Sequence, residues 1–283
     1  MPTPSTLDLR NGVAVLTGAG SGIGAALALQ LAERGSHLAL VDINAVGLES
    51  TAAQARAKGV TVSSVVLDLA QPESASQLLA AVQAAHGRAT LLINNAGVAV
   101  GGTFEQVAAA DFDWLMSINF AAVVRLTRAF MPMLQAAPAA QIVNISSIFG
   151  LVAPPGQTAY CASKFAVCGF SESLRHELEM AGSPVRVTVV HPGGVRTGIA
   201  ENSRKPRGID AEVLSHQKRL WERMLVLSPD AAAGRILAAI ESRAPRVLVG
   251  RDAVQASWVQ RLFPVRYWRV MAPALARAMK KAK

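Results

Sequence analysis

The chain has few cysteines and no long apolar run, and each shortage excludes a class of protein. It contains two cysteines in 283 residues, Cys161 and Cys168, which lie seven positions apart on one expected helix. Two helical turns separate them by roughly 10 Å, which is too far for a disulfide, so we expect free thiols in a reducing compartment. No apolar run approaches the roughly 18 residues that span a bilayer, and residues 1–10 lack the apolar core of a secretion signal. These shortages predict a cytoplasmic protein.

Histidine and acidic residues are also scarce. The five histidines show no spacing typical of metal ligands, so we expect no metal site. Only 19 acidic residues stand against 28 basic ones, which gives a net charge of +9. This excess is local, because residues 251–283 hold eight basic residues and a single acid, Asp252, and so carry +7 of the total. The positive charge is therefore concentrated in residues 251–283, and residues 1–250 carry only +2.

Short apolar runs alternate with helical segments along the chain, and 51% of all residues are hydrophobic. We expect strands near 13–17, 37–42, 61–67, 90–94, 141–146, 185–191 and 246–249. The longest helices are expected near 105–135 and 157–181. This alternation predicts an α/β fold with one doubly wound Rossmann-type domain over residues 1–250, in which helices cover both faces of a seven-stranded parallel sheet. Ligands of such sheets bind beyond the carboxyl ends of the strands.

A glycine-rich turn joins the first expected strand to the first helix. It reads Thr17-Gly18-Ala19-Gly20-Ser21-Gly22-Ile23-Gly24. Glycines allow the backbone to approach a ligand closely, and the start of a helix offers free N–H groups to a pyrophosphate. A strand before the turn and a helix after it are the context in which this motif indicates a dinucleotide site.

Asp42 ends the second expected strand, about 20 residues after the glycines, where a carboxylate binds the ribose hydroxyls of NAD. The same carboxylate would repel the 2′-phosphate of NADP, and no basic residue stands at Ser21 or directly after Asp42 to offset that repulsion. Alternatively, Asp42 only caps a helix or forms a turn. We favour ribose binding, and with it NAD over NADP.

Tyr160 and Lys164 lie one helical turn apart, and Ser147 follows the expected strand before them. A fixed positive charge beside a tyrosine favours the phenolate and lowers the pKa of the phenol. A tyrosine tuned in this way exchanges a proton with an alcohol or a carbonyl group, and the Ser147 hydroxyl is placed to bind the same oxygen. A tyrosine and a lysine at this spacing are more often an ordinary surface pair. Here the dinucleotide motif in the same chain favours a catalytic role for them.

Together these residues resemble the short-chain dehydrogenase/reductase family, in its form of about 250 residues, followed here by a basic C-terminal extension. The resemblance runs from about Asn11 to Val249. Its matching positions are Gly18, Gly22, Ile23, Gly24, Asp68, Asn94, Asn95, Ala96, Gly97, Asn119, Ser147, Tyr160, Lys164, Pro192, Gly193 and Thr197. It implies a catalytic tetrad of Asn119, Ser147, Tyr160 and Lys164, in which Asn119 kinks its helix and holds a water that links Lys164 to solvent.

The resemblance also implies which residues bind the cofactor. Asp68 and Leu69 would flank the adenine. Residues 94–97 would line the cofactor groove, but small and amide residues at the end of a strand can also serve only to brace neighbouring strands. The expected cofactor-binding residues are Gly18, Ser21, Gly22, Ile23, Gly24, Asp42, Asp68, Leu69, Asn95, Ala96, Gly97, Tyr160, Lys164, Pro192, Gly193, Val195 and Thr197. The long helices near 105–135 and 157–181 would form the contact of a homodimer or homotetramer.

The resemblance implies an NAD(H)-dependent oxidoreductase that interconverts a secondary alcohol and a ketone by hydride transfer. Two alternatives are an NADPH-dependent carbonyl reductase and a non-catalytic protein that senses dinucleotides. Residues 197–227 would cover the substrate, and their apolar members, Leu214, Trp221, Met224 and Leu225, favour a hydrophobic, lipid- or sterol-like substrate.

Residues 251–283 form a basic, amphipathic extension in which aromatic and aliphatic residues alternate with arginines. We expect Pro264 and Pro273 to break it into short helices. Its apolar face either packs on its own domain or a neighbouring subunit, or lies on an anionic membrane surface. Stacking on nucleic acid is a third alternative, but nucleic acid is not expected as a main partner because the motifs at the strand ends already explain the domain.

Overall fold

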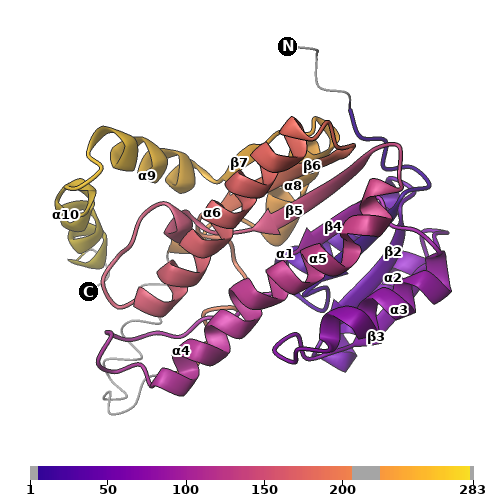
Figure 1. Ribbon diagram of the computed structural model, residues 1–283. Coiled ribbons are helices and arrows are strands. Elements are labelled where there is room, and N and C mark those ends of the chain that lie inside the picture. Colours follow the sequence, from indigo (N-terminus) through magenta and orange to yellow (C-terminus); the bar gives the residue numbers. More distant parts are fainter. Residues whose placement is uncertain (1–5, 206–223, 281–283) are drawn as a thin grey trace.

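A seven-stranded parallel sheet forms the centre of the protein (Figure 1). The computed structural model describes residues 6–205 and 224–280, with side chains up to residue 273. The strands are β1 (Val13–Thr17), β2 (His37–Asp42), β3 (Val62–Val66), β4 (Leu91–Asn94), β5 (Ala140–Ile145), β6 (Val185–Pro192) and β7 (Arg246–Val249). They lie in the order β3-β2-β1-β4-β5-β6-β7, which confirms the predicted fold class.

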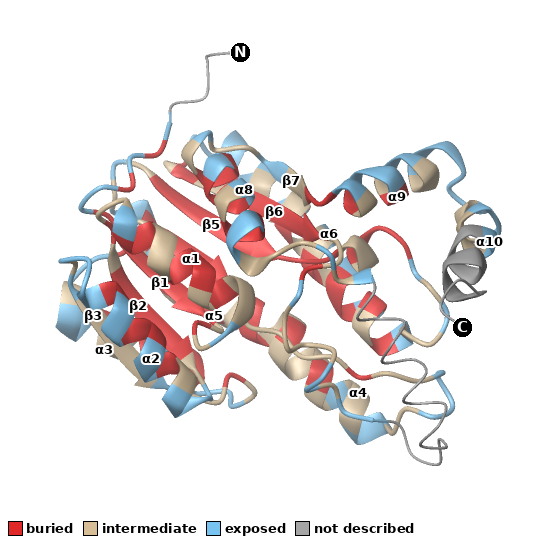
Figure 2. Ribbon diagram, turned by 180° about the vertical axis from the view of Figure 1, so that it is seen from behind, coloured by how far each residue is buried: buried red, intermediate tan, exposed pale blue. Residues whose placement is uncertain are grey.

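Helices cover both faces of the sheet (Figures 1 and 2). The helices are α1 (Gly22–Glu33), α2 (Ala45–Arg56), α3 (Ser74–His86), α4 (Ala109–Met116), α5 (Ala122–Gln135), α6 (Thr158–Met180), α8 (Pro229–Glu241), α9 (Arg251–Leu262) and α10 (Tyr267–Lys280). One face packs against α1, α2 and α8, and the other packs against α3, α5 and α6. Within residues 6–205 and 224–280, no helix combines the length and the hydropathy that crossing a membrane requires.

Most strands are apolar at consecutive positions because they serve two cores, whereas the edge strand β3 contains Ser63 and Ser64 and is only partly buried. In β1, Ala14 and Leu16 belong to the core under α1 and α8, whereas Val15 belongs to the core under α5. Neighbouring side chains of a strand point to opposite faces, so a sheet covered on both sides requires unbroken apolar runs. This requirement explains why the strands could be located within one or two residues from the sequence.

The strand order reverses between β1 and β4, which are direct neighbours in the sheet. From β1 the chain continues outward through β2 and β3, and from β4 it continues in the other direction through β5, β6 and β7. The connections after β1 and β4 therefore leave toward opposite faces and open a crevice at their carboxyl ends. The expected site residues follow the strands at this edge.

The expected helix near 105–135 differs from the structure, in which three segments replace it. α4 ends at Met116, a π-helical segment spans Ser117–Ala121, and α5 begins at Ala122. A π-turn inserts an extra residue into the helical ladder and is frequent at functional sites. Hydropathy patterns do not reveal such an insertion, because the helix continues in nearly the same direction after it.

After β7 the chain packs on the rest of the protein through one side of α9, where Ala253 and Ala256 are buried. α9 ends at Leu262, shortly before Pro264, as expected. The expectation for Pro273 was wrong, because α10 continues through this residue. Proline has no N–H to donate to the carbonyl of Arg269, so the helix loses one hydrogen bond at this position without ending.

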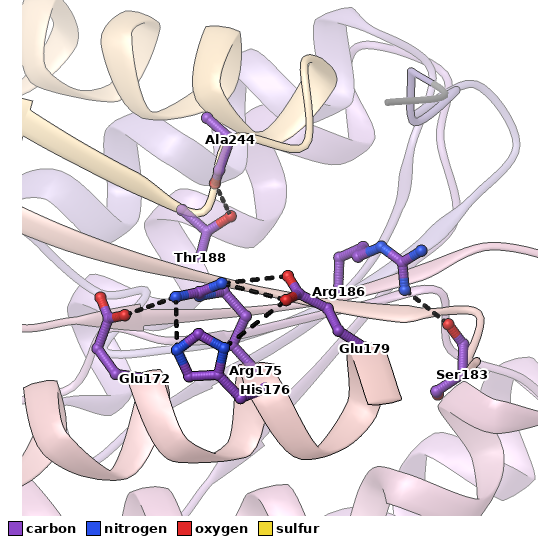
Figure 3. A network of polar contacts seen from close by, with 8 residues as sticks. All are labelled: Glu172, Arg175, His176, Glu179, Ser183, Arg186, Thr188 and Ala244. Carbon is purple, nitrogen blue, oxygen red and sulfur yellow. Dashed lines mark hydrogen bonds and ion pairs between the residues drawn. The ribbon is translucent and has the colours of Figure 1, made fainter. Parts of the chain in front are cut away.

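The C-terminal half of α6 carries a network of ion pairs that lies away from Tyr160 and Lys164. Arg175 contacts Glu172 at 2.8 Å and Glu179 at 3.2 Å, one helical turn to either side (Figure 3). The hydrogen bond that Arg175 donates to the Glu172 carboxylate is the largest cause that raises the pKa of Arg175. Both cysteines also lie on α6 and are free thiols. These contacts hold the end of the helix whose beginning carries the candidate catalytic residues.

Candidate active site

One cavity of about 1440 Å³ lies along the carboxyl edge of the sheet. Of the predicted site residues, it is lined by Gly18, Ser21, Gly22, Ile23, Gly24, Asp42, Asp68, Leu69, Asn95, Ala96, Gly97, Ser147, Tyr160, Lys164, Pro192, Gly193, Val195 and Thr197. Asn119 is the exception, because it is fully buried behind the cavity wall. A typical ligand pocket measures roughly 300–1,000 Å³, so this cavity has room for more than one small molecule.

The glycine turn requires glycine at two positions for steric reasons. Gly18 has a φ of +66°, and a Cβ there would lie 2.8 Å from the Cα of Ala96. A Cβ on Gly24 would overlap the carbonyl oxygen of Gly18. Ser21 caps α1 in an extended conformation, and no acidic residue occupies the first turn of the helix. The N–H groups at the start of α1 and their partial positive charge therefore face the cavity, where they attract an anion.

Asn95 braces the glycine turn against the end of β4. Its Nδ2 donates to the carbonyl oxygens of Thr17 at 2.9 Å and Gly18 at 3.1 Å. The backbone N–H groups of Asn95 and Ala96 both donate to the Thr17 hydroxyl at 3.0 Å. The Asn95 amide thus connects the ends of β1 and β4, so the residue braces neighbouring strands. It also lines the cavity, as expected for a residue that binds the cofactor.

Asp42 lies under the glycine turn at the end of β2. Its Oδ2 accepts a hydrogen bond from the Gly20 N–H at 2.8 Å, and its Oδ1 accepts one from the Asn44 N–H at 2.9 Å. Two backbone donors therefore fix the carboxylate at the wall of the cavity. Asp68 is held similarly by the Ala70 N–H at 2.9 Å and by Gln71, so two oriented acids flank this end of the cavity.

Ser147, Tyr160 and Lys164 converge on the middle of the cavity from two elements. Ser147 follows β5, where it caps the short helix Ile148–Gly150 by accepting a hydrogen bond from the Phe149 N–H at 3.1 Å. Tyr160 and Lys164 occupy the first turns of α6. The Lys164 Nζ donates to the carbonyl oxygen of Ile145 at 3.0 Å and lies 5.6 Å from the centroid of the Tyr160 ring.

The protein alone does not lower the pKa of Tyr160, contrary to the expectation from the sequence. Burial raises the pKa of Tyr160 to about 12, and a hydrogen bond with the Ser147 side chain opposes this to a smaller extent. Burial also lowers the pKa of Lys164 to about 8. Desolvation of the buried phenol is therefore the largest cause of the shift, although the Lys164 ammonium lies beside the ring.

Asn119 lies in the π-helical segment and connects α4–α5 with α6. Its Oδ1 accepts from the Val98 N–H at 2.8 Å, and its Nδ2 donates to the Val98 carbonyl at 2.9 Å and to the Ser163 hydroxyl at 3.1 Å. Ser163 directly precedes Lys164 in α6. The π-helical turn thus positions the Asn119 amide between two elements. It binds the chain after β4 at Val98, and it binds α6, which carries Tyr160 and Lys164, at Ser163.

Asp252 is a residue of the site that the sequence did not indicate. It lies in the first turn of α9, lines the cavity, and its Oδ2 accepts a hydrogen bond from the Gly194 N–H at 2.6 Å across 58 residues of sequence. A Cβ on Gly193 would overlap the same carboxylate. The loop that begins at Gly193, directly after β6, is therefore tied to the start of α9. No local sequence motif indicates a contact between residues so far apart in the chain.

His191 was also missed as a neighbour of the site. It is fully buried in β6, with its Nδ1 3.0 Å from the carbonyl oxygen of Ser147. Burial lowers the pKa of His191 to about 4, so the imidazole is neutral near pH 7. A neutral ring in this place supports the backbone at Ser147 without adding charge beneath the cavity.

The described part of the expected covering segment is fixed to α4 by Arg204. The guanidinium contacts Asp111 at 2.7 Å and stacks on Trp114 with its centre 3.5 Å from the ring centroid. On the far side of the gap, Met224 and Leu225 line the cavity, as does Arg204. The expectations for Leu214 and Trp221 lie outside the described residues.

The end of the cavity beyond Tyr160 is mainly apolar, and the extension contributes to it. Val259 of α9, Trp268 and Met271 of α10, and Phe149 and Val152 after β5 all line the cavity. The Tyr267 hydroxyl accepts a hydrogen bond from the Ala153 N–H at 3.0 Å, which fixes the start of α10 to the loop after the short helix. Residues far apart in the sequence thus form one wall.

Comparisons with known proteins agree with this geometry. The family model described as "short chain dehydrogenase" matches residues 12–208. A Mycobacterium tuberculosis protein named oxidoreductase SadH is 42% identical over 272 residues, which cover 96% of this chain and 98% of that protein.

Two solved structures with similar folds contain dinucleotides. A Burkholderia phymatum short-chain dehydrogenase/reductase in complex with NAD has a TM-score of 0.84 at 32% identity, over 90% of this chain and 94% of that one. A metagenomic short-chain oxidoreductase in complex with NADP has a TM-score of 0.69 at 32% identity, over 86% and 98% of the two chains. The family match, the full-length relative and the shared crevice lead to one conclusion: this chain belongs to the short-chain dehydrogenase/reductase family of oxidoreductases, which use a nicotinamide dinucleotide.

Proposed function

We propose that the protein interconverts a hydrophobic secondary alcohol and its ketone with NAD(H), using Ser147, Tyr160 and Lys164 with Asn119 behind them. One observation carries this proposal. The same cavity is lined by the glycine turn and Asp42 at one end, by Tyr160 and Ser147 in the middle, and by apolar side chains at the other end. A dinucleotide and a small-molecule substrate would meet at the two hydroxyl groups.

In the proposed mechanism, the bound dinucleotide supplies the hydride acceptor or donor and, in its oxidised form, a positive charge. Tyr160 takes the hydroxyl proton from the alcohol, or returns it to the ketone oxygen. Ser147 donates a hydrogen bond to the substrate oxygen as negative charge develops there, a contribution of typically about 3 kcal/mol. Because the pKa of Tyr160 is about 12 in the protein alone, where Lys164 already lies beside the ring, oxidation depends on the further positive charge that the oxidised cofactor would bring near the phenol.

The choice of NAD over NADP rests on Asp42. Its carboxylate lines the cavity and is held by two backbone N–H groups, so it has little freedom to turn away from a 2′-phosphate. An NADPH-dependent carbonyl reductase is the second candidate, since one of the similar structures contains NADP. The Asp42 carboxylate favours the NAD(H)-dependent enzyme over this NADPH-dependent reductase.

The apolar end of the cavity supports a hydrophobic substrate. Phe149 and Val152 come from the proposed catalytic domain, residues 1–250, and Val259, Trp268 and Met271 come from the proposed extension, residues 251–283. Burying apolar surface contributes about 25 cal/mol per Å², so each added methylene of a substrate chain strengthens binding. We also expect a homodimer or homotetramer, as the family resemblance implies.

The test is a panel of secondary alcohols of increasing chain length, with NADH absorbance as the readout. We expect kcat/KM to rise with chain length by roughly fourfold per methylene, because about 0.8 kcal/mol is gained for each buried CH₂. The same dinucleotide without substrate is the background control. Tight dinucleotide binding without turnover of any alcohol or ketone would instead support the non-catalytic sensor.

Asp252 is proposed as a positioning residue that holds the loop after β6 against the dinucleotide. Replacement by alanine removes the acceptor of the 2.6 Å hydrogen bond from the Gly194 N–H. We expect Asp252→Ala to weaken NADH binding about tenfold, since hydrogen bonds to charged groups contribute roughly 1.5–3 kcal/mol. Fluorescence titration with NADH measures this change.

Asp8→Ala is the matched control for this prediction. The Asp8 carboxylate also accepts a hydrogen bond from a backbone N–H, that of Arg10 at 2.9 Å, but at an exposed position. This variant should bind NADH like the parent protein. If Asp252→Ala lowers the melting temperature but leaves the NADH affinity unchanged, Asp252 is a structural residue only.

A further inference from the structure

The corner formed by α9 and α10 exposes an unusual group of apolar side chains. Among the described residues, fourteen large hydrophobic side chains are exposed, and six of them lie between residues 254 and 270. They are Val254, Trp258, Leu262, Phe263, Val265 and Val270. We call this set, together with Arg261, Arg266 and Arg269, the α9–α10 corner. Figure 2 shows α9 and the start of α10 at the edge of the molecule, with exposed residues along the outer side.

The exposed side chains form a face distinct from the one that packs on the domain. Ala253 and Ala256 of α9 are buried against the domain. Trp258 is 59% exposed, Leu262 is 67% exposed and Val265 is 90% exposed. Val254, Trp258 and Leu262 recur every four residues, so they follow one side of the helix. Clustered exposed apolar side chains of this kind mark an interaction surface.

The charge of the corner is uniformly positive. Arg261, Arg266 and Arg269 are exposed, and none of them takes part in an ion pair with another described residue. The acid nearest in sequence, Asp252, directs its carboxylate inward to Gly194. A partner for this surface must therefore offer negative charge and an apolar layer together.

An anionic lipid surface meets both requirements. Phosphate groups attract the arginines, and the boundary of the acyl chains accepts the tryptophan, leucine and valines. A second copy of the chain fits less well, because a twofold contact would place these arginines against their own copies. Nucleic acid offers the charge but no layer for Leu262, Val265 and Val270.

The corner also borders the cavity. Val270 is 46% exposed and lines the cavity as well, together with Trp268 and Met271 of the same helix. The exposed surface and the apolar end of the cavity thus meet at α10. An apolar molecule dissolved in a membrane would reach this end of the cavity without crossing water.

We propose that the α9–α10 corner docks the protein on the surface of anionic membranes, with the apolar end of the cavity next to the lipid. The docking surface stands on exposure and charge alone and does not depend on the proposed reaction. The full chain is expected to sediment with vesicles of phosphatidylcholine that contain about one third phosphatidylglycerol, and to do so less at about 1 M salt than at about 0.1 M, where screening is weaker.

Two sets of substitutions test the corner. The variant Arg261→Gln/Arg266→Gln/Arg269→Gln and the variant Leu262→Ser/Val265→Ser should each lower the vesicle partition coefficient at least about tenfold. The charge-matched control is Arg10→Gln/Arg56→Gln/Arg128→Gln, which removes three exposed arginines elsewhere on the surface. The control should retain vesicle binding. Circular dichroism establishes that each variant is folded.

Two results would overturn the proposal. One is equal sedimentation of the parent protein and both corner variants. The other is a change in oligomeric mass, measured by light scattering, in the corner variants while their vesicle binding stays at the parent level. The second result would assign the corner to a contact between copies of the chain. Because neither readout involves turnover, both stay separate from a failure of the proposed reaction.

Discussion

Tyr160→Phe is expected to lower kcat by about 10²–10⁴-fold, which is the usual contribution of a positioned acid or base. The substitution removes only the hydroxyl group that would exchange a proton with the substrate. The ring, its edge-to-face contact with Phe149 at 6.1 Å and the neighbouring Lys164 remain. The affinity for NADH should therefore change by less than about twofold. Steady-state kinetics and NADH titration measure the two quantities separately.

The chain supplies its own control, because Tyr267 is the other of its two tyrosines. Tyr267→Phe removes a hydroxyl that accepts a hydrogen bond from the Ala153 N–H and should leave kcat within about threefold of the parent value. Full activity of Tyr160→Phe would show that another group carries the proton. Loss of NADH binding would show that the phenol serves mainly to shape the groove.

Asp42→Asn is expected to shift the cofactor preference toward NADP. Two unit charges about 4 Å apart repel each other by about 4 kcal/mol near a protein surface, and a 2′-phosphate carries at least one such charge. The amide keeps an oxygen that can accept the hydrogen bond from Gly20, so the glycine turn stays in place. We expect the ratio of the NADP and NAD dissociation constants to fall by up to roughly 1,000-fold, since every 1.4 kcal/mol corresponds to a factor of ten.

Asp68→Asn is the matched control, because Asp68 is the other acid held by backbone at this end of the cavity. The family resemblance assigns it to the adenine and not to the ribose phosphate. Its replacement should change both dissociation constants by similar factors. Tighter binding of NADP than of NAD by the unmodified protein would contradict the role assigned to Asp42.

The sheet and the crevice were predictable because they follow from local patterns. Strands buried on both faces need mainly apolar runs, and such runs are visible in the sequence. The carboxyl ends of parallel strands share one edge, so residues as distant as Gly18 and Pro192 could be assigned to one crevice before any coordinates were known. The structure brings them to one cavity.

Three features could not be predicted, each for a physical reason. The π-helical turn at Asn119 leaves the hydropathy pattern almost unchanged, so only the family resemblance, and no local pattern, indicated an irregular helix there. The direction of the pKa shift of Tyr160 depends on burial, which sequence spacing does not report. The hydrogen bond between Asp252 and Gly194 joins residues 58 positions apart. The break expected at Pro273 failed because a helix tolerates the loss of one hydrogen bond there.

The wall that α9 and α10 contribute to the cavity has a consequence for selectivity. The family model matches residues 12–208, whereas Val259, Trp268 and Met271 lie well beyond that stretch. Under the proposed function, part of the choice of molecule is therefore encoded outside the stretch that carries the reaction, while Phe149 and Val152 contribute from within it. Exchanging the terminal helices between related proteins would redirect the same chemistry to new compounds and leave the proton-transferring groups untouched.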